Sequence, residues 1–419
     1  MTSNTNEPSK VAFWYDKEKR AIIYQVMAIL VVGLISYYLF SNTQANLEKQ
    51  NISTGFGFFE KESSFEISES LVKYSAADTY ADALWVGVLN TLKVAFIGII
   101  LTTLLGTFVG VARLSSNWLI SRLAAIYIEV LQNIPILLQL FFFYSLFSEL
   151  LPGPRDALIP IKGILLCNRG IYFTIPADHP VYFYMGMAFL LAIFICVLLT
   201  RKSKKIQEQT GNTMFQLFYI KLESSAPSLM RIFSPIFNGP FANTLFSVFI
   251  LLLLPFIVWL IGGAPTELNA PALAGFNIEG GTNFSPEFGA LLTGLVIYTS
   301  AFVAEVVRAG IQSVSSGQSE AAKSLGLKPG LILNLIILPQ ALRVIIPPLT
   351  SQLLNLTKNS SLAVAIGYPD FVFVANTTIN QTGQAIEGVA MIMVVYLCFS
   401  LLTSVFMNWY NKKMALVER

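Results

Sequence analysis

The sequence predicts an all-α polytopic membrane protein with about eight transmembrane helices. Of its 419 residues, 54% are hydrophobic and only 12% are charged, whereas about 25% of the residues in an average soluble domain are charged. The mean hydropathy is +0.64. A membrane helix needs about 20 consecutive apolar residues, and the chain contains eight such runs. The composition therefore excludes a soluble cytoplasmic enzyme and a disordered chain.

The eight apolar runs are separated by polar segments. They are residues 21–40, about 84–112, about 123–149, 181–200, about 241–262, about 288–307, about 332–356 and about 388–409. The first run is too long for a cleaved signal peptide, so we expect it to be an anchor. Pro135 should bend the third span. The seventh run contains Pro339, Pro347 and Pro348, and each of these prolines removes a backbone donor from a membrane helix.

The distribution of Lys and Arg predicts the orientation of the chain. With the N-terminus in the cytoplasm, 19 of the 27 basic residues lie in cytoplasmic segments and 7 lie outside. Positive charge is retained on the cytoplasmic side, so eight spans with both termini inside are favoured over nine. The acidic loop 41–83 and the Gly- and Pro-rich loop 263–287 should be solvated outside. The basic stretch 201–240 should be a cytoplasmic linker that also contacts anionic headgroups.

The chain lacks the residues that several chemistries require. One His and three Cys cannot build a haem pair, a zinc site or a disulfide framework. A net charge of +3 is too small for a nucleic-acid partner. The dipeptide Gly-Lys does not occur, so the usual P-loop for ATP is missing. There is no Gly-x-Ser-x-Gly nucleophile motif either. We therefore expect no cofactor, no metal and no enzymatic activity, and energy for uphill transport must come from another subunit.

The cytoplasmic segment 308–343 is more elaborate than a simple connector. Ser315 and Gln318 have capping-box spacing, which suits a helix start. Gly326 stands where a helix end needs a positive φ. These signals predict a short helix over about 316–325 that offers small residues to a partner. The alternative is an amphipathic surface helix that touches only lipid, but the segment contains neither Trp nor Phe.

One motif in this segment resembles a known family. Glu320, Ala321 and Ala322, followed by Gly326 and later by Pro339, resemble the EAA loop of binding-protein-dependent ABC-transporter permeases. The resemblance implies that the short helix is a coupling helix that docks in a groove of a cytoplasmic ATPase. These five residues are therefore the expected ATPase-coupling site.

The flanking residues resemble the polar and general L-amino-acid branch of that family. The matching positions include Asn90-Thr91-Leu92, Arg113, Tyr127-Ile128-Glu129, Pro135, Gln139, Pro286-Glu287-Phe288, Tyr298-Thr299, Ala304-Glu305, Val307-Arg308-Ala309-Gly310, Gly317-Gln318 and Leu338-Pro339-Gln340-Ala341. The resemblance covers 84–150 and 286–410. It implies a five-helix type I importer core. Smaller members join these two parts by a short loop, so the intervening residues resemble the insertion of the long form.

The resemblance also suggests four regions and a set of partners. Residues 1–83 would be a tail, a first span and a periplasmic loop, 84–150 and 286–419 the two parts of the core, and 151–285 an insertion with two spans. The implied partners are an ATPase, a second permease in a hetero- or homodimer, a periplasmic binding protein and an L-amino-acid substrate. The expected location is the bacterial inner membrane.

Polar residues inside a span are candidates for the substrate path, because burying them in lipid is costly. Glu129, Gln132 and Asn133 share one helix face. They either line the path or make interhelical hydrogen bonds. Glu129 could also pair with Arg343. Lys93, inside the second span, should line the interior or reach an edge.

A second group of candidates follows the seventh span. Lys358, Ser360 and Ser361 resemble a Lys-x-Ser/Thr-Ser-Leu element of the family. An ammonium with nearby hydroxyls can bind a carboxylate. Alternatively, Lys358 extends to the outer membrane surface.

Two other functions compete with the importer. A secondary transporter needs ionisable residues at mid-membrane, and here these are chiefly Glu129 and Lys93. A membrane enzyme needs a nucleophile, a metal or a base set, and the sequence offers none.

Overall fold

The computed structural model describes residues 17–49, 54–210 and 242–414. It divides the chain into two units. The first runs to Leu151, includes Asn168–Gly170 and resumes at Phe284, and the second comprises Pro152–Cys167 and Ile171–Asn283. The predicted linker beyond residue 210 lies outside the described residues, as do the first 16 and last five residues.

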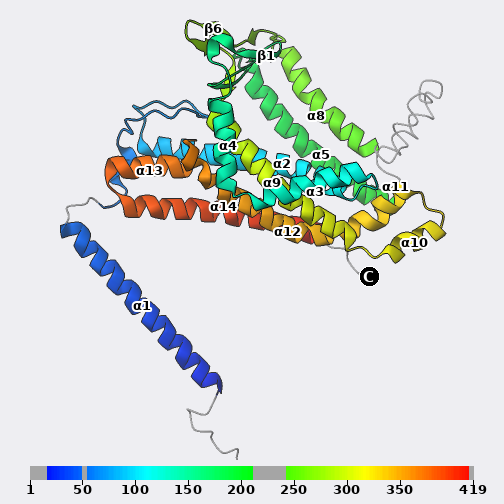
Figure 1. The fold of residues 1–419 in the computed structure, drawn as a ribbon, viewed down its shortest axis with the longest axis horizontal. Helices are drawn as coiled ribbons and strands as arrows, with labels where there is room; N and C mark the ends of the chain where they lie inside the picture. The colour runs from blue at the N-terminus through cyan, green and yellow to red at the C-terminus, as the bar shows by residue number, and fades with distance from the viewer. Residues whose placement is uncertain (1–16, 50–53, 211–241, 415–419) are drawn as a thin grey trace, which may run out of the picture. The chain divides into compact units, whose positions relative to one another are not determined.

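The first unit consists of a helical bundle and an N-terminal helix whose membrane-length window has no buried residue (Figure 1). Its helices are α1 (Lys17–Lys49), α2 (Tyr80–Arg113), α3 (Trp118–Asn133), α4 (Ile136–Ser148), α9 (Pro286–Gln312), α10 (Ser316–Ser324), α11 (Pro329–Ile332), α12 (Leu338–Asn359), α13 (Phe371–Thr382) and α14 (Ala385–Met414). A short turn η2 (Gly57–Glu60), a π-helix η4 (Leu333–Ile337) and a 3₁₀ segment η5 (Ser360–Ile366) complete it.

Small residues allow α2 and α9 to pack closely. Gly98, Gly106 and Gly110 recur on one face of α2. A Cβ on Gly106 would lie 2.6 Å from the Cβ of Val303, and one on Gly110 would lie 2.6 Å from the carbonyl oxygen of Ala304. Membrane helices associate through such small-residue contacts. The α2–α9 pair is therefore the centre of the first unit.

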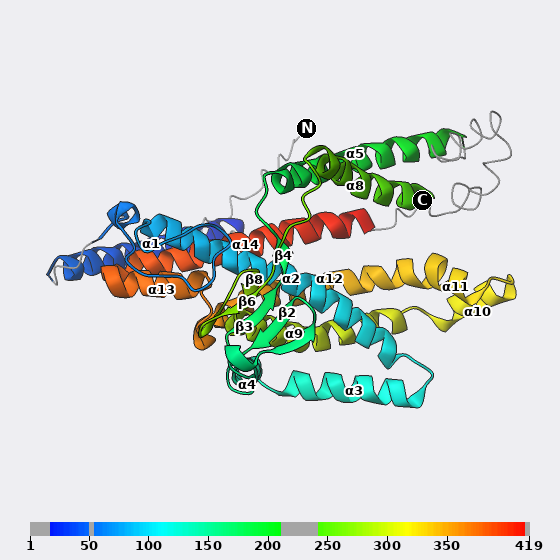
Figure 2. The same cartoon turned by 90° about the horizontal axis from the view of Figure 1, so that it is seen from above.

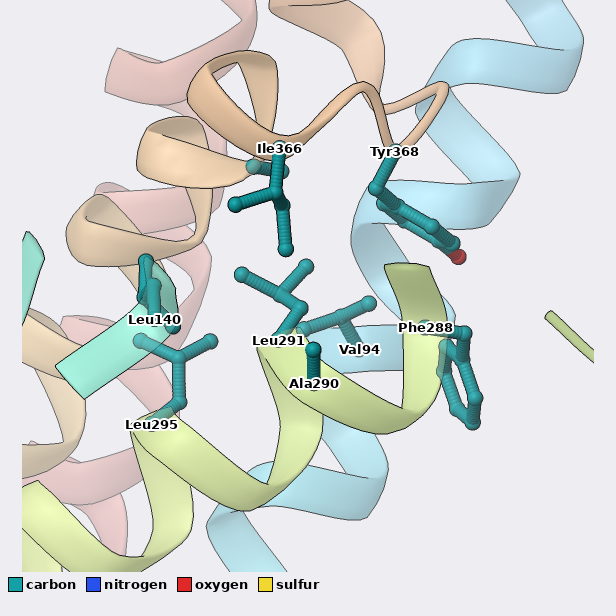
Figure 3. Close-up of a cluster of buried hydrophobic side chains, with 9 residues drawn as sticks. Val94, Leu140, Phe288, Ala290, Leu291, Leu295, Ile366 and Tyr368 are labelled. Carbon is teal, nitrogen blue, oxygen red and sulfur yellow. The ribbon is translucent and has the colours of Figure 1, made fainter. Parts of the chain in front are cut away.

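A hydrophobic cluster joins four elements near one end of α9. Val94 of α2, Leu140 of α4 and Leu291 of α9 are fully buried. Figure 3 shows the Leu291 side chain directed toward Ile366 of η5, while the Phe288 ring lies below Tyr368. The centroids of these two rings are 5.8 Å apart. The cluster fixes η5 against the bundle.

The expected third span is two helices and not one. α3 and α4 meet at an angle of 105°, which Figure 1 shows clearly. Pro135 stands between them and lacks the N–H that would continue the helix. The bend at Pro135 is thus confirmed. The third expected span, about 123–149, is interrupted there, so it is made of two helices.

The other expected spans coincide with helices. Among the described residues, six helices are long and apolar enough to cross a membrane, or seven if the bent α3–α4 pair is counted as one span. The remaining expected span, 241–262, coincides with α8 (Ala242–Ile261), a shorter apolar helix over Ser247–Ile261. The seventh expected span begins with the π-helix η4. Pro339 has no N–H for the carbonyl of Leu335, which accounts for the wider turn there.

The second unit is a helical hairpin with short strands. Its helices are α5 (Val181–Thr210) and α8, which lie side by side in Figures 1 and 2. Its strands are β1 (Leu158–Ile161), β2 (Ile164–Cys167), β3 (Gly170–Phe173), β4 (Ile175–Pro176), β5 (Leu268–Asn269), β6 (Ala272–Ala274), β7 (Asn277–Glu279) and β8 (Thr282–Phe284), with a turn η3 (Pro154–Asp156) before them. They form a sheet of order β1-β2-β3-β8 and two ladders, β4-β5 and β6-β7.

These strands were not predicted from the sequence. The sequence predicts only a solvated segment over 263–287, yet β5–β8 lie within it. Gly280 and Gly281 turn the chain between β7 and β8 at φ values of 81° and 65°. Only glycine adopts such angles readily. The Gly-Gly pair was the one local signal of regular structure in this loop.

Candidate functional site

The helix α10 is exposed at one end of the first unit. Figures 1 and 2 place it with α11 at the end of the bundle opposite α13. All nine of its residues are described, and only Ala322 is buried. Glu320 and Ala321 are exposed, and Leu325 just beyond the helix is 81% exposed. The helix therefore presents small and polar side chains that the rest of the described chain does not cover.

The end of α10 is fixed by its backbone. Gly326 has a φ of 73°, as the sequence predicts. The Leu327 N–H donates to the carbonyl of Ala322 (3.2 Å) and the Gly326 N–H donates to that of Lys323 (2.9 Å). This is a Schellman-type ending. It turns the chain sharply back toward α11, so α10 protrudes as a separate element.

The start of α10 differs from the prediction. The helix begins at Ser316 after Ser315, but the Ser315 side chain makes no capping hydrogen bond. The Gln318 N–H instead donates to the backbone carbonyl of Ser315 (3.1 Å). The predicted capping box is therefore wrong, although the helix boundaries are confirmed. Pro339 is half-buried at the start of α12.

A polar cavity lies between α9 and α12. Its volume is about 270 Å³, and its lining residues are Tyr298, Thr299 and Phe302 of α9 with Gln352, Asn355 and Asn359 of α12. The Thr299 hydroxyl is buried and has no hydrogen-bond partner among the described residues. Amides and hydroxyls both donate and accept hydrogen bonds. The cavity can therefore bind a small solute that carries both hydrogen-bond donors and hydrogen-bond acceptors.

A polar pattern in the sequence of α12 corresponds to this cavity. Gln352, Asn355 and Asn359 are spaced by three and four residues along α12. They therefore form a polar stripe on one helix face, in a helix otherwise rich in Leu, Ile and Pro. On the sequence alone, Tyr298 and Thr299 are only positions that match the family motif.

The predicted residues of α3 lie outside this cavity. Gln132 donates from Nε2 to the backbone carbonyl of Ala301 on α9 (3.2 Å), which is an interhelical hydrogen bond. Asn133 donates from Nδ2 to the carbonyl of Glu129 (2.6 Å). The Glu129 side chain is exposed. Among the described residues it forms no ion pair with Arg343, so the hypothesis that these two residues pair is wrong.

The residues Lys358, Ser360 and Ser361 surround the end of α12. The Ser360 hydroxyl donates to the carbonyl of Thr357 (2.8 Å), and that of Ser361 donates to the carbonyl of Lys358 (2.7 Å). Both hydroxyls thus satisfy carbonyls at the helix end. Lys358 is exposed in the last turn of α12. A cation at this end of a helix interacts favourably with the helix dipole.

Lys93 reaches an acidic partner outside α2. Its ammonium pairs with the Glu69 carboxylate, and both side chains are about 10% exposed. It also lies 4.2 Å from the centroid of the Phe288 ring. The second Glu69 oxygen accepts from the Ser285 hydroxyl (2.5 Å) at the start of α9. The pair therefore ties the loop before α2 to two core helices.

A buried carboxyl lies beside η5. Asp370 is fully buried, caps α13 by accepting from the Phe373 N–H (2.9 Å), and accepts from the Tyr396 hydroxyl (2.9 Å). Burial raises the pKa of Asp370 to about 7. Burial also raises the pKa of Tyr368, because loss of water disfavours the charged form.

Comparison with known proteins identifies the family. The model of the family described as "Binding-protein-dependent transport system inner membrane component" matches residues 236–416. The general L-amino acid transport system permease protein AapQ of Rhizobium johnstonii is 43% identical over 97% of this chain and 94% of its own length. The chain belongs to this family of transport permeases.

Two further relatives match over almost the whole permease. The putative amino-acid ABC transporter permease protein YhdX of Escherichia coli is 45% identical over 96% of the permease and 95% of its own length. The glutamate/glutamine/aspartate/asparagine transport system permease protein BztB of Rhodobacter capsulatus is 36% identical over 99% of this chain and 99% of its own length. The insertion 151–285 therefore lies within a region that the matches span, and the helical, multi-pass membrane class is confirmed.

Proposed function

We propose that this permease imports L-amino acids through an ABC transporter of the inner membrane, with α10 as its coupling helix. The relatives named above are amino-acid permeases, which supports the substrate class. The observation that carries the coupling role is the exposure of α10, in which only Ala322 is buried. An ATPase that binds this helix can move the bundle as a rigid body.

The surface offered to the ATPase consists of Glu320 and Ala321 on α10 and Gly326 after it. Small side chains allow close approach of a partner, and a carboxylate near a helix can pair with a partner cation. Ala322 acts differently, because it packs inward and fixes α10 on its own chain. Pro339 begins the helix that would carry the movement to the cavity.

The cavity between α9 and α12 is the proposed substrate position. At about 270 Å³ it is smaller than the range of about 300–1,000 Å³ of drug-sized sites, which suits a small solute. Its amide oxygens can accept from an α-ammonium, and its amide N–H groups and hydroxyls can donate to a carboxylate. Its six lining residues are uncharged, so the interactions are with groups that all amino acids share.

Lys358, Ser360 and Ser361 stand at the end of α12 that follows the cavity-lining Gln352 and Asn355. The exposed Lys358 ammonium can attract the substrate carboxylate before it enters. Glu129, Gln132 and Asn133 belong to the proposed path outside the cavity, on α3, where Gln132 holds α3 against α9.

The remaining parts of the proposal are the partners and the orientation. ATP is bound by a separate ATPase, a second permease subunit completes the membrane domain, and a periplasmic binding protein delivers the amino acid. The surplus of Lys and Arg in the proposed cytoplasmic segments supports cytoplasmic termini.

Uptake by proteoliposomes tests this function. They would contain the full-length chain with the ATPase, permease and binding protein from its own genome. We expect uptake of a radiolabelled amino acid only with hydrolysable ATP. Asn355→Ala should reduce uptake several-fold, whereas the exposed Asn376→Ala on α13 should leave it unchanged. Uptake driven by an ion gradient without ATPase would instead identify a secondary transporter.

A further inference from the structure

A second cavity lies within the α5–α8 hairpin of the second unit. Its volume is about 540 Å³. On α5 its wall includes Tyr182 and Phe189, and on α8 it extends from Leu251 to Trp259. At 1.5 Å per residue this stretch of α8 spans about 12 Å, which is less than half of a bilayer core of about 30 Å. A cavity of this length fits within the depth of one leaflet.

The strand layer closes one end of this cavity. Pro176 of β4 and Leu268 of β5 line it and pair with each other in the β4–β5 ladder. The Tyr182 hydroxyl and the Trp259 indole N–H both donate to the carbonyl of Pro265, at 3.3 and 3.2 Å. These two bonds hold the rings with their polar tips at the closed end. Tyr and Trp favour this position at a membrane–water interface.

The closed end is acidic. Glu267 lines the cavity there, and its backbone carbonyl accepts from the N–H of Ala177 (2.9 Å), the residue before exposed Asp178. The loop 263–287 contains no Lys or Arg. The hydroxyl of Thr266, which also lines the cavity, can donate to an anionic oxygen. The cavity is therefore apolar along its length and acidic at its closed end. These two properties match an amphiphile with an apolar chain and a head group that carries a positive charge.

We propose that the α5–α8 cavity binds an aminophospholipid of the outer leaflet of the inner membrane, such as phosphatidylethanolamine. The acyl chain lies between Phe189 and Leu251. The head-group ammonium pairs with the Glu267 carboxylate, and the phosphate accepts from the Thr266 hydroxyl. A transmembrane helix of a partner fits less well, because it would need a groove along the whole of α8 and the cavity ends at mid-membrane.

Native mass spectrometry of the full-length chain in detergent tests the proposal. The chain would be incubated with phosphatidylethanolamine or phosphatidylglycerol of identical acyl chains. We expect the wild type to retain the ethanolamine lipid preferentially. Leu251→Trp should fill the cavity and lower the retention of both lipids, whereas Leu253→Trp, on the same helix but outside the cavity wall, should change neither.

The head-group assignment has its own variants. Glu267→Gln should reduce the preference for the ethanolamine lipid by about two- to fivefold, the range for an exposed ion pair. Glu279→Gln, a change to an exposed carboxylate of β7, should leave this preference unchanged.

Equal retention of the two lipids by the wild type would overturn the proposal, as would unchanged retention in Leu251→Trp. A change of oligomeric state in Leu251→Trp without lipid loss would overturn it in favour of a helix interface. Glu267→Gln decides the outcome if Leu251→Trp fails to insert.

Discussion

Gln139 supplies the hydrogen-bond donor that Pro135 removes from the bent third span. The helical partner of the Leu131 carbonyl would be the N–H of residue 135, which proline lacks. The Gln139 Nε2 group donates to this carbonyl (3.0 Å) and to that of Ile134 (3.0 Å). The bend between α3 and α4 is therefore satisfied by a side chain from the helix that follows it.

Gln139→Met should weaken this bend, because it keeps the side-chain length but removes the donor. Each carbonyl left without a partner costs about 1–3 kcal/mol. We expect a lower thermal midpoint in detergent, whereas exposed Leu138→Met should leave the midpoint unchanged. If Gln139→Met unfolds at the wild-type temperature, the side chain does not stabilise the bend.

Gly106→Ala should separate α2 from α9. The added methyl group would lie 2.6 Å from Val303 and 2.9 Å from the carbonyl oxygen of Ser300, and such overpacking costs about 1–3 kcal/mol. Thermal unfolding should show this loss, and the double variant Gly106→Ala/Val303→Ala should recover part of it. Gly186→Ala on α5 is the control, since its Cβ would meet nothing within 4 Å. Equal stability of the Gly106 and Gly186 variants would contradict the close packing.

Lys93→Met should destabilise the permease more than the double variant Lys93→Met/Glu69→Leu. Removing one partner of a buried ion pair leaves the other charge unpaired and costs about 3–5 kcal/mol. Removing both avoids that cost. Unfolding midpoints of the two single variants and the double variant form a cycle that measures the coupling. Strictly additive effects would show that the pair makes no net contribution.

Asp370 should make stability depend on pH. Its pKa is about 7 in the folded chain and 3.8 in its ordinary state, so the folded chain binds the proton more tightly between these values. Its contribution to stability is fully present below pH 3.8 and is lost as the pH rises through 7. Asp370→Asn should flatten the pH dependence of the thermal midpoint between pH 5 and 8.

A second substitution at the same position separates charge from capping. Asn retains an oxygen for the Phe373 N–H, whereas Asp370→Ala leaves that N–H without an acceptor at a cost of about 1–3 kcal/mol. Asp370→Ala should therefore be less stable than Asp370→Asn at every pH. A wild-type pH profile in the Asn variant would place the titrating group elsewhere.

The sequence predicted the parts of the fold that depend on local chemistry. Apolar runs gave the helices, Pro135 gave the bend, and Gly326 gave the end of α10. Each follows from a property of one segment, such as the missing N–H of proline. The proposed coupling residues follow from a motif, and the structure adds that Ala321 is exposed while Ala322 is buried.

The sequence could not predict contacts between distant segments. The partner of Lys93 is Glu69, which precedes α2 and was only one of several acidic residues in its loop. The polar cavity needs α9 and α12 side by side, and neither helix alone indicates that Thr299 and Asn355 line the same cavity. The strands β1–β8 are two to four residues long, too short for an alternating pattern to stand out.

The central claim, that α10 is the docking element for an ATPase, is tested most directly by a binding measurement. The affinity of the purified ATPase for the full-length chain in lipid nanodiscs would be compared between wild type and Ala321→Arg, a change on an exposed position that should leave the melting temperature unaltered. The account predicts measurable binding to the wild type and at least about tenfold weaker binding to the variant, a difference of about 1.4 kcal/mol. Equal affinities in two equally stable proteins would contradict it.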